Sequence, residues 1–315
     1  MKKNFGIMIL TVAMLCCLLV CGCAGASADD SNVSLRIATG GMTGTNYISG
    51  AAVSALINDC MDGAIGYVEA TSGANENIDL LKSGEVELGY CNSTTAVESM
   101  SELGDISSIG VMMMQDIHII TNKKSNITCI EDLRGKKISV GSMGSGVEVV
   151  TESFLKIFGI GEDEYSHVYG STSEAFEQVA SGDSDCYLAI TTVGGSSVTE
   201  CLNKDDVQLL SLDEETLKGI ADSNTQYMVD TIPAGTYSNI NEDYMTLSAP
   251  VLLLVRNDLS EDEVYNLAKT IYENHDFLVK QSKLMEACTP ENATLGNPVS
   301  LHAGVVKYFR EKGIL

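Results

Sequence analysis

The sequence predicts an α/β protein with two lobes, each a mainly parallel sheet flanked by helices, and a ligand cleft between the lobes. Three observations lead to this prediction. Apolar strand-like runs alternate with helix-like runs along most of the chain, which is typical of parallel βαβ units. The chain, at 315 residues, is too long for one modest core. Polar or glycine-rich segments follow many of the strand-like runs, where open α/β sheets bind ligands.

Residues 1–22 are predicted to be an export signal of the bacterial lipoprotein type. Two lysines precede an apolar run, residues 7–20, which is too short for a typical transmembrane helix. The run ends in VCGC, which looks like a lipobox, so we expect cleavage before Cys23 and a lipid on its thiol. Residues 23–32 would form a polar tether to the outer face of the cytoplasmic membrane. A plain secretory signal cleaved a few residues later remains the alternative.

Charge and composition narrow the range of partners. Removing Lys2 and Lys3 from the 19 Lys and Arg residues leaves 17 against 43 Asp and Glu residues, a formal charge of −26 for the mature chain. Such a chain is not expected to bind nucleic acid, because neutralising phosphates needs clustered basic residues. Trp is absent and aromatic residues make up 6% of the chain, which disfavours a stacking platform for sugars or bases. We expect an acidic surface and a monomer.

Residue types that carry out catalysis or bind metals are scattered. The four histidines lack His or Cys partners at metal-ligand spacing, and neither G-x-S-x-G nor H-E-x-x-H occurs. Acidic runs such as residues 162–164 and 213–215 resemble solvated loops and helix starts. We therefore predict a binding protein with no cofactor and no metal, not an enzyme. Both disulfides and buried thiols stay open for the six cysteines beyond the signal, Cys60, Cys91, Cys129, Cys186, Cys201 and Cys288.

Lobe one is predicted to comprise residues 33–121 and 250–315. After a first strand that begins near Leu35, hydrophobic periodicity predicts strands over 65–70, 86–91 and 117–121 and helices over 50–59 and 75–83. The chain is expected to return after a break at Ala249–Pro250 into an apolar strand, residues 251–255. A capping box at Ser260–Glu263 then opens a helix over 264–272, and a last helix covers 305–312.

Lobe two is predicted to comprise residues 122–249, entered through the polar connector 122–126. The same alternation predicts strands over 138–140 and 185–190 and helices over 147–158 and 175–180. Two crossings between the lobes make a hinge, and a small ligand would bind in the cleft.

Two glycine-rich loops are the first candidate binding segments. Residues 39–47 combine glycines, hydroxyls, an amide and a phenol, so bare backbone N–H groups can approach a ligand. They do not match G-x-G-x-x-G, which disfavours dinucleotide binding. Residues 141–146 lack the Gly-Lys-Ser/Thr of a P-loop but can present a helix N-terminus and hydroxyls to a carboxylate, with a packing turn as the alternative.

Three further strand ends are polar, and all five could converge on one cleft. They are residues 71–77, 92–94 and 191–195, the last of which supplies the candidates Thr191 and Thr192. None of the mature chain's four arginines lies in a strand-end loop. A ligand carboxylate would then be held by backbone N–H groups, hydroxyls and helix N-termini, and neutral ligands remain open.

Several segments together resemble the TAXI family of solute receptors for TRAP (tripartite ATP-independent periplasmic) transporters. They are IATGGMTGTNY at 37–47, EATSGANEN at 69–77, LKSGEVELG at 81–89, LRGKKISVGSMGSG at 133–146 and TIPAGTY at 231–237. The resemblance covers nearly all of the mature chain, and the last segment is its most specific motif.

The resemblance implies a two-lobed, periplasmic-binding-protein-like (type II) receptor. Such a receptor closes over a small organic anion, a dicarboxylate or an acidic amino acid such as glutamate or 2-oxoglutarate, and delivers it to a TRAP-type permease. Carried over by position, the residues that would line the site are Thr39, Gly44, Thr45, Tyr47, Ser72, Asn92, Ser93 and Ser145. Tyr47 could instead pack the first helix.

The chain departs from the family pattern at two places. Val147 stands where a Thr commonly follows G-S-G, and residues 191–193 replace a more apolar stretch, which leaves the ligand open. The alternatives are a receptor for an ATP-driven importer or a sensor kinase and, from another class, an exported enzyme on the same fold.

Overall fold

The protein's structure, a computed structural model, describes residues 33–238 and 240–315. The predicted export signal, the tether and Cys23 lie outside the described residues. Within the described part of the chain, no helix combines the length and the apolar character needed to cross a bilayer.

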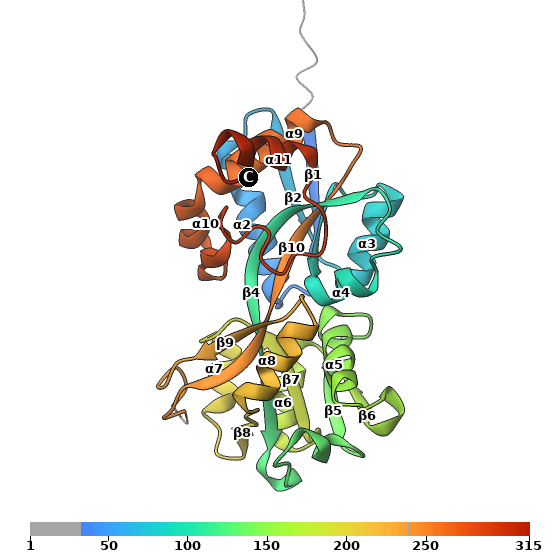
Figure 1. The fold of residues 1–315 in the computed structure, drawn as a ribbon, viewed down its shortest axis with the longest axis vertical. Helices are drawn as coiled ribbons and strands as arrows, with labels where there is room; N and C mark the ends of the chain where they lie inside the picture. The colour runs from blue at the N-terminus through green and yellow to red at the C-terminus, as the bar shows by residue number, and fades with distance from the viewer. Residues whose placement is uncertain (1–32, 239) are drawn as a thin grey trace, which may run out of the picture. The chain divides into compact units, whose positions relative to one another are not determined.

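A ten-stranded sheet runs through residues 34–315, which form one unit (Figure 1). Its strand order is β2-β1-β3-β10-β4-β7-β5-β6, with β8 added to β4 and β9 added to β10. The strands are β1 (Val33–Ala38), β2 (Ala64–Glu69), β3 (Leu88–Asn92), β4 (Ile106–Asn122), β5 (Lys137–Gly141), β6 (Ser166–Tyr169), β7 (Cys186–Thr191), β8 (Val207–Leu209), β9 (Met228–Ile232) and β10 (Tyr244–Arg256).

Two long strands, β4 and β10, lie side by side at the centre of the sheet and extend into both of its halves (Figure 1). They pair antiparallel with each other, β10 is antiparallel to β3, and β4 is antiparallel to β7. The parallel pairs lie outside them, β1 with β3 in the first half and β5 with β6 and β7 in the second. The α/β prediction is confirmed, but the halves share one mixed sheet because these two strands run through both.

The expected break at Ala249–Pro250 is wrong, because β10 continues through both residues. On one edge β10 pairs with β9 up to Ser248 and with β3 only from Val251 onward. Pro250 lies where β10 changes its neighbour, so its missing N–H costs the ladder little on that edge. The proline therefore marks a change of strand partner and not the start of a strand.

Helices cover both faces of both halves and enclose four hydrophobic cores (Figure 1). In the first half, α2, α9, α10 and α11 share a core with β1 and β3, and α3 and α4 cover the other face. In the second half, α5 and α8 pack on one face, and α6 and α7 on the other. The helices are α2 (Thr45–Cys60), α3 (Ala74–Ser83), α4 (Ser93–Glu98), α5 (Gly146–Ile157), α6 (Thr172–Ser181), α7 (Ser196–Leu202), α8 (Glu214–Ser223), α9 (Glu261–Glu273), α10 (His275–Gln281) and α11 (Ala303–Glu311).

The predicted start of α9 is confirmed in detail. The Ser260 side chain accepts a hydrogen bond from the Glu263 N–H, and the Glu263 carboxylate accepts one from the Ser260 N–H at 2.7 Å. The connector after β4 is a short 3₁₀ turn, Lys123–Ser125, as its polarity indicates. All six described cysteines are free thiols, and four of them, Cys91, Cys186, Cys201 and Cys288, are buried.

Candidate ligand-binding site

A cavity of about 380 Å³ lies among the strand-end loops of both halves. This volume falls within the range of small-ligand sites. The lining residues of the first half are Gly40, Gly41, residues 43–46, Ile48, Ser72, Gly73, Asn92, Gln115 and residues 282–284. Those of the second half are Gly141, Ser142, residues 145–147, Ser171, Thr172, Phe176, residues 190–192 and residues 195–197. The polar strand ends therefore converge, as the pattern of α/β sheets predicts.

Seven of the ten candidate residues line this cavity. They are Gly44, Thr45, Ser72, Asn92, Ser145, Thr191 and Thr192. Thr39, Tyr47 and Ser93 do not line it. The buried Thr39 hydroxyl donates to the Glu69 carbonyl at 2.6 Å and ties β1 to β2, and the buried Ser93 hydroxyl donates to the Gln226 carbonyl at 3.1 Å. These two hydroxyls stabilise the fold, and their hydrogen bonds are already donated to backbone carbonyls.

Helix α2 begins at Thr45, five residues earlier than the sequence predicts, so Thr45 and Tyr47 lie in its first turn and not in a loop. Gly50 lies inside this helix, where a Cβ atom would approach the Thr39 side chain to 2.4 Å. Glycine at position 50 thus lets α2 pack closely on β1 and hold its N-terminus beside the cavity.

The N-terminus of α2 carries no capping side chain. Its N-cap residue is Gly44, in an extended conformation, and its first turn contains no acidic residue. Among the described residues, no side chain accepts a hydrogen bond from its first N–H groups, and no acidic residue of its first turn compensates the positive end of the helix dipole. The neighbouring Asn46 lines the cavity, and its Oδ1 atom is buried with no hydrogen-bond partner among the described residues. We call this uncapped N-terminus of α2, residues 44–47, the open wall of the cavity.

Two helices of the second half, α5 and α6, end differently at the cavity, whereas α7, like α2, has a glycine N-cap and no acidic residue in its first turn. The Ser145 hydroxyl accepts a hydrogen bond from the Glu148 N–H at 3.3 Å, and the Glu148 carboxylate accepts one from the Gly144 N–H. At α6, Ser171 and Glu174 form a complete capping box. Acidic residues three positions after each N-cap therefore occupy these helix ends. The expectation that the 141–146 loop presents its helix N-terminus to a ligand carboxylate stays a prediction, since Glu148 already bonds part of that end.

A short chain of side-chain hydrogen bonds crosses the first-half side of the cavity. Asn92 donates to Gln115 Oε1 at 2.9 Å, and Gln115 donates in turn to the Thr45 hydroxyl. Gln115 is not among the predicted site residues, because it lies inside the long strand β4 and not at a strand end. Its signal is a Gln-Asp pair that interrupts an otherwise apolar run, VMMMQDIHII.

The two halves approach each other closely beside this chain. A Cβ atom on Gly146 would lie 2.3 Å from Asn92 Oδ1, and one on Gly73 would lie 3.0 Å from the Ser145 Cα. Gly73 adopts a positive φ of 138°, so glycine is needed there on both counts. Small residues at these two positions allow the strand-end loops of both halves to surround one cavity.

Lys283 is the only charged residue among the described residues that line the cavity. It begins the 3₁₀ turn Lys283–Ala287, which follows α10, and its ammonium group has no ion-pair partner among the described residues. Lys283 is not among the predicted site residues, because the segment 283–287 is far in sequence from any predicted strand end. The return of the chain through β10 brings it to the cavity.

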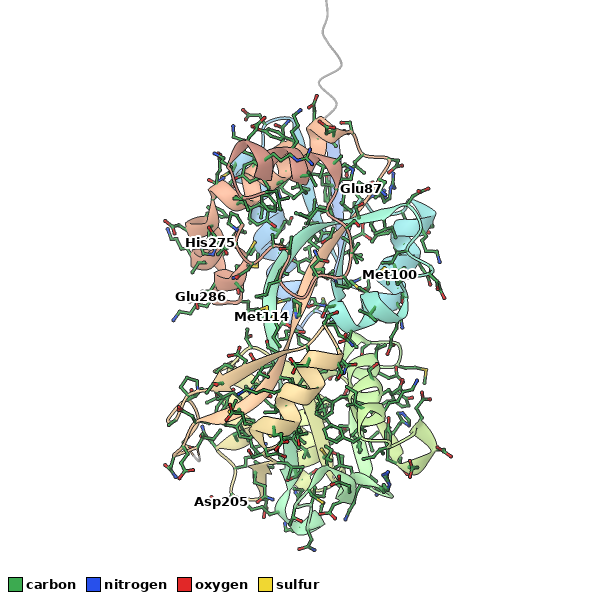
Figure 2. The ribbon with its side chains drawn as sticks, viewed as in Figure 1. Glu87, Met100, Met114, Asp205, His275 and Glu286 are labelled. Atoms are coloured by element: carbon green, nitrogen blue, oxygen red, sulfur yellow. The ribbon has the colours of Figure 1, made fainter. Side chains whose placement is uncertain are left out.

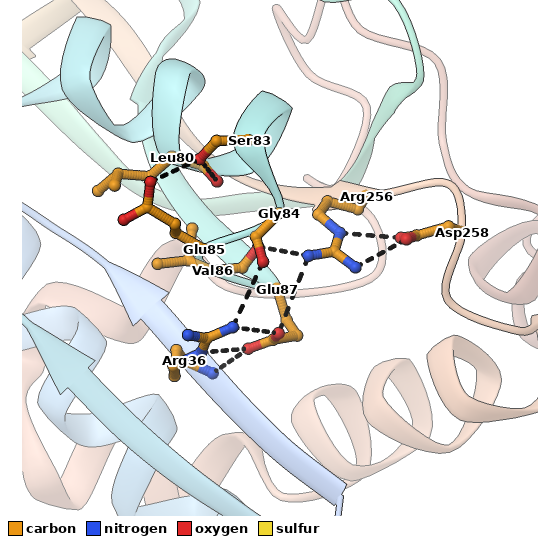
Figure 3. A network of polar contacts seen from close by, with 9 residues as sticks. All are labelled: Arg36, Leu80, Ser83, Gly84, Glu85, Val86, Glu87, Arg256 and Asp258. Carbon is orange, nitrogen blue, oxygen red and sulfur yellow. Dashed lines mark hydrogen bonds and ion pairs between the residues drawn. The ribbon is translucent and has the colours of Figure 1, made fainter.

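The arginines of the described chain are held elsewhere. Figure 3 shows Arg36 paired with Glu87 at 2.9 Å and Arg256 paired with Asp258 at 2.7 Å, at the edge of the sheet where β10 ends. Arg134 pairs with Glu164 at 3.2 Å. None of the four lines the cavity, so its positive potential comes from Lys283 and from the uncapped N-termini of α2 and the shorter α7.

Histidines are scattered through the structure. His275 on α10 contacts the carbonyls of Met285 and Glu286, and it lies far along the molecule from Asp205 (Figure 2). His118 is buried in β4. Among the described residues, no three His, Cys, Asp or Glu side chains form a group that could hold a metal ion.

Solved structures with the same arrangement place the fold in a known class. PhnD1 from Prochlorococcus marinus, in complex with methylphosphonate, is 11% identical, with a TM-score of 0.56 over 91% of this chain and 100% of that chain. An L-cystine ABC transporter protein from Listeria monocytogenes is 13% identical, with a TM-score of 0.52 over 82% and 98%. A histidine kinase sensor domain similar to periplasmic binding proteins is 14% identical, with a TM-score of 0.52 over 82% and 98%. The protein has the periplasmic-binding-protein-like α/β fold.

Within this class, the sequence identifies the family. Residues 37–313 match the profile of the NMT1-like family. The chain belongs to the NMT1-like family.

Proposed function

We propose that the protein is an extracytoplasmic solute receptor. It captures a small organic anion in the 380 Å³ cavity, by closure of lobe one (residues 33–121 and 250–315) and lobe two (122–249), and delivers it to a membrane permease. The anion is a dicarboxylate or an acidic amino acid such as glutamate or 2-oxoglutarate. The observation that carries this proposal is the electrostatic character of the cavity within an acidic chain of net charge −24.

Two features of the cavity favour an anion. The uncapped N-terminus of α2 offers backbone N–H groups and the positive end of a helix dipole. Lys283 adds a full positive charge, and no carboxylate is present among the described lining residues. A ligand with two carboxylates can use both features at once, one carboxylate for each. The hydroxyls of Thr45 and Thr192 can donate to it as well, whereas the Ser72 hydroxyl already donates to the Glu76 carboxylate at 2.6 Å.

The residues that line the cavity favour binding over catalysis. They include many hydroxyl groups, but the described lining residues contain no His, Cys, Asp or Glu that could serve as a base or an activated nucleophile. A receptor needs only a polar cavity that closes. An exported enzyme on this fold remains the less favoured reading.

The partner is proposed from the motifs at 37–47, 133–146 and 231–237, which resemble the TAXI receptors of TRAP transporters. Cys23 would anchor the protein by its lipid to the outer face of the cytoplasmic membrane as a monomer. The comparison structures include an ABC transporter protein and a kinase sensor domain, which support the alternative of an ATP-driven importer or a sensor kinase. The gene beside this one distinguishes these partners, since a multi-span permease without an ATPase favours TRAP transport.

The proposal is tested by thermal unfolding of the purified mature protein with L-glutamate, 2-oxoglutarate and succinate. We expect at least one of them to raise the unfolding temperature without being consumed. Lys283→Met should weaken binding by about 1.5–3 kcal/mol, because it removes a charged hydrogen-bond donor. Lys280→Met is the matched control, since Lys280 is exposed on α10 and does not line the cavity. No shift with any of the three solutes, or consumption of one, would contradict the proposal.

A further inference from the structure

The loop between β7 and α7 is held from behind by a buried polar cluster. Thr192 and Gly195 line the cavity, whereas Gly194 donates its N–H to the Tyr237 hydroxyl at 3.0 Å on the other side. Tyr237, the last residue of the TIPAGTY segment, is buried and lies edge-on to His118. A motif that is remote in sequence therefore touches the back of a cavity wall.

Hydrogen bonding fixes the proton positions in this cluster. His118 Nδ1 lies 3.1 Å from the Asp116 carbonyl oxygen, which can only accept, so Nδ1 carries the proton. The other ring nitrogen, Nε2, must then accept from the Tyr237 hydroxyl at 2.8 Å. Burial lowers the pKa of His118 to about 4, which keeps the ring neutral in this arrangement. The chain of donors runs from Gly194 through Tyr237 to His118.

Asp116 completes the cluster beside this chain. Its side chain is 3% exposed and lies on β4 opposite Thr191 of β7 and Ser248 of β10. The neighbouring Ser248 hydroxyl donates to the Gln115 carbonyl at 3.3 Å, and the negative charge of Asp230 on β9 acts on the Asp116 carboxyl. The cluster thus adjoins the loop at two places, through strand pairing at Thr191 and through the Gly194 N–H.

The Asp116 carboxyl is in a setting that favours its neutral form. Its Oδ1 atom is buried and accepts no hydrogen bond from the described residues. Burying an ionised carboxylate oxygen without a donor costs free energy, so the neutral form is favoured. Burial, and then the negative charge of Asp230, raise the pKa of Asp116 to about 7. The other titratable groups facing it are His118 on its own strand and Tyr237, whose pKa burial raises to about 12.

We propose that Asp116, His118 and Tyr237 are positioning residues that hold residues 191–195 in the solute-binding conformation, and that solute affinity depends on the protonation of the buried Asp116 carboxyl. This inference rests on the proposed anion receptor. When Asp116 is neutral, it adds no negative charge behind the cavity wall. When the proton is lost, a buried carboxylate lies there in addition to the exposed Asp230, and an anionic solute is repelled.

The first experiment measures hydrogen exchange of residues 191–196 in the protein without solute. Tyr237→Phe removes the hydroxyl that accepts the Gly194 N–H, and we expect exchange in this segment to quicken at least tenfold. Tyr265→Phe is the matched control, because the Tyr265 hydroxyl contacts Glu311 on the far side of α9. Equal exchange in the wild type and Tyr237→Phe would overturn the positioning role, whether or not any solute binds.

The second experiment measures the Kd of 2-oxoglutarate between pH 5.5 and 8.5, a range in which its carboxylates stay ionised. In the wild type we expect affinity to fall above pH 7, by up to about tenfold per pH unit. Asp116→Asn should give a flat profile. Asp230→Asn, a change at an exposed position, should move the fall to lower pH, because the negative charge of Asp230 raises the pKa of Asp116.

The outcomes separate the two proposals. A wild-type profile that is flat, or that keeps its slope in Asp116→Asn, would overturn the proton linkage while leaving the receptor proposal intact. Absence of binding at every pH would count against this solute class for the receptor and would overturn the linkage as stated. The exchange measurement would still judge the positioning role on its own.

Discussion

Helix α2 of the first half and helices α5 and α6 of the second half meet the cavity with N-terminal ends of opposite kinds. The N-cap of α2 is Gly44 and the third residue after it is Tyr47, so its N-terminus is open. In the second half, α5 and α6 have a serine at the N-cap and a glutamate three residues later, Glu148 and Glu174. The comparison teaches that a glycine-rich loop before a helix does not by itself make an anion site. What matters is whether the first turn of the helix already contains an acidic residue that bonds its free N–H groups.

The halves also differ in what stands behind the cavity wall, and the largest expected effect concerns this difference. The pKa of Asp116 is raised from its usual value, near 4, to about 7 in the folded protein. The folded protein therefore binds more protons than the unfolded chain between these values, and its free energy of unfolding falls as the pH rises from about 4 to about 7. The loss would be on the order of a few kcal/mol.

Urea unfolding of the solute-free protein at pH 5 and pH 8 measures this effect. Asp116→Asn should lose most of the difference between the two pH values, because an amide does not titrate. A mutation in the first half, such as Lys283→Met, should leave the pH dependence as it is in the wild type. If Asp116→Asn retained the full pH dependence, the raised pKa would belong to another group and the two halves would not differ in this way.

The second prediction adds an acidic residue to the uncapped N-terminus of α2. Tyr47→Glu places a carboxylate at the third position of α2, where α5 and α6 have Glu148 and Glu174. The new acid should compensate the helix dipole and repel an anionic solute, which weakens its binding by about 1–2 kcal/mol. Thermal unfolding should show equal or slightly higher stability without solute.

Tyr47→Gln is the control, since it changes the side chain without adding a charge. Isothermal titration of both variants with 2-oxoglutarate separates the effect of charge from the effect of losing the aromatic ring. Equal affinities for the two variants would mean that the α2 N-terminus does not face the ligand, and the comparison between the halves would lose its functional meaning.

Sequence reasoning located the strand ends well and the individual side chains less well. The loops at 39–47, 141–146 and 191–195 were found because glycines and hydroxyls after an apolar run are a local pattern. Thr39 and Ser93 belong to the same pattern, yet their hydroxyls are bonded to backbone carbonyls of other segments. Only the tertiary structure shows whether a hydroxyl is free.

The residues that were missed depend on long-range placement. Lys283 reaches the cavity because β10 carries the chain back to the first half, and no local pattern marks that lysine. Gln115 lies within β4, whose 17 residues extend well beyond the predicted strand 117–121. Antiparallel pairing with β10 sets that length, and a strand's partner cannot be read from its own sequence. The break predicted at Pro250 failed for the same reason.

The smallest expected effect comes from removing the charge of Glu148 at the capped N-terminus of α5. The Glu148 carboxylate accepts hydrogen bonds from the Gly144 N–H and, at 2.9 Å, from the Tyr169 hydroxyl. Glu148 does not line the cavity. Glu148→Gln keeps an acceptor but removes the charge, so α5 should lose about 0.3–1 kcal/mol of dipole compensation. The same change removes a negative charge beside Ser145, so an anionic solute should bind about two- to threefold more tightly, as about 0.5 kcal/mol of repulsion is lost. Thermal unfolding and titration of the same sample measure both. Stability and affinity must move in opposite directions if α5 is closed by its own glutamate; a loss of affinity would instead place Glu148 among the groups that orient the solute.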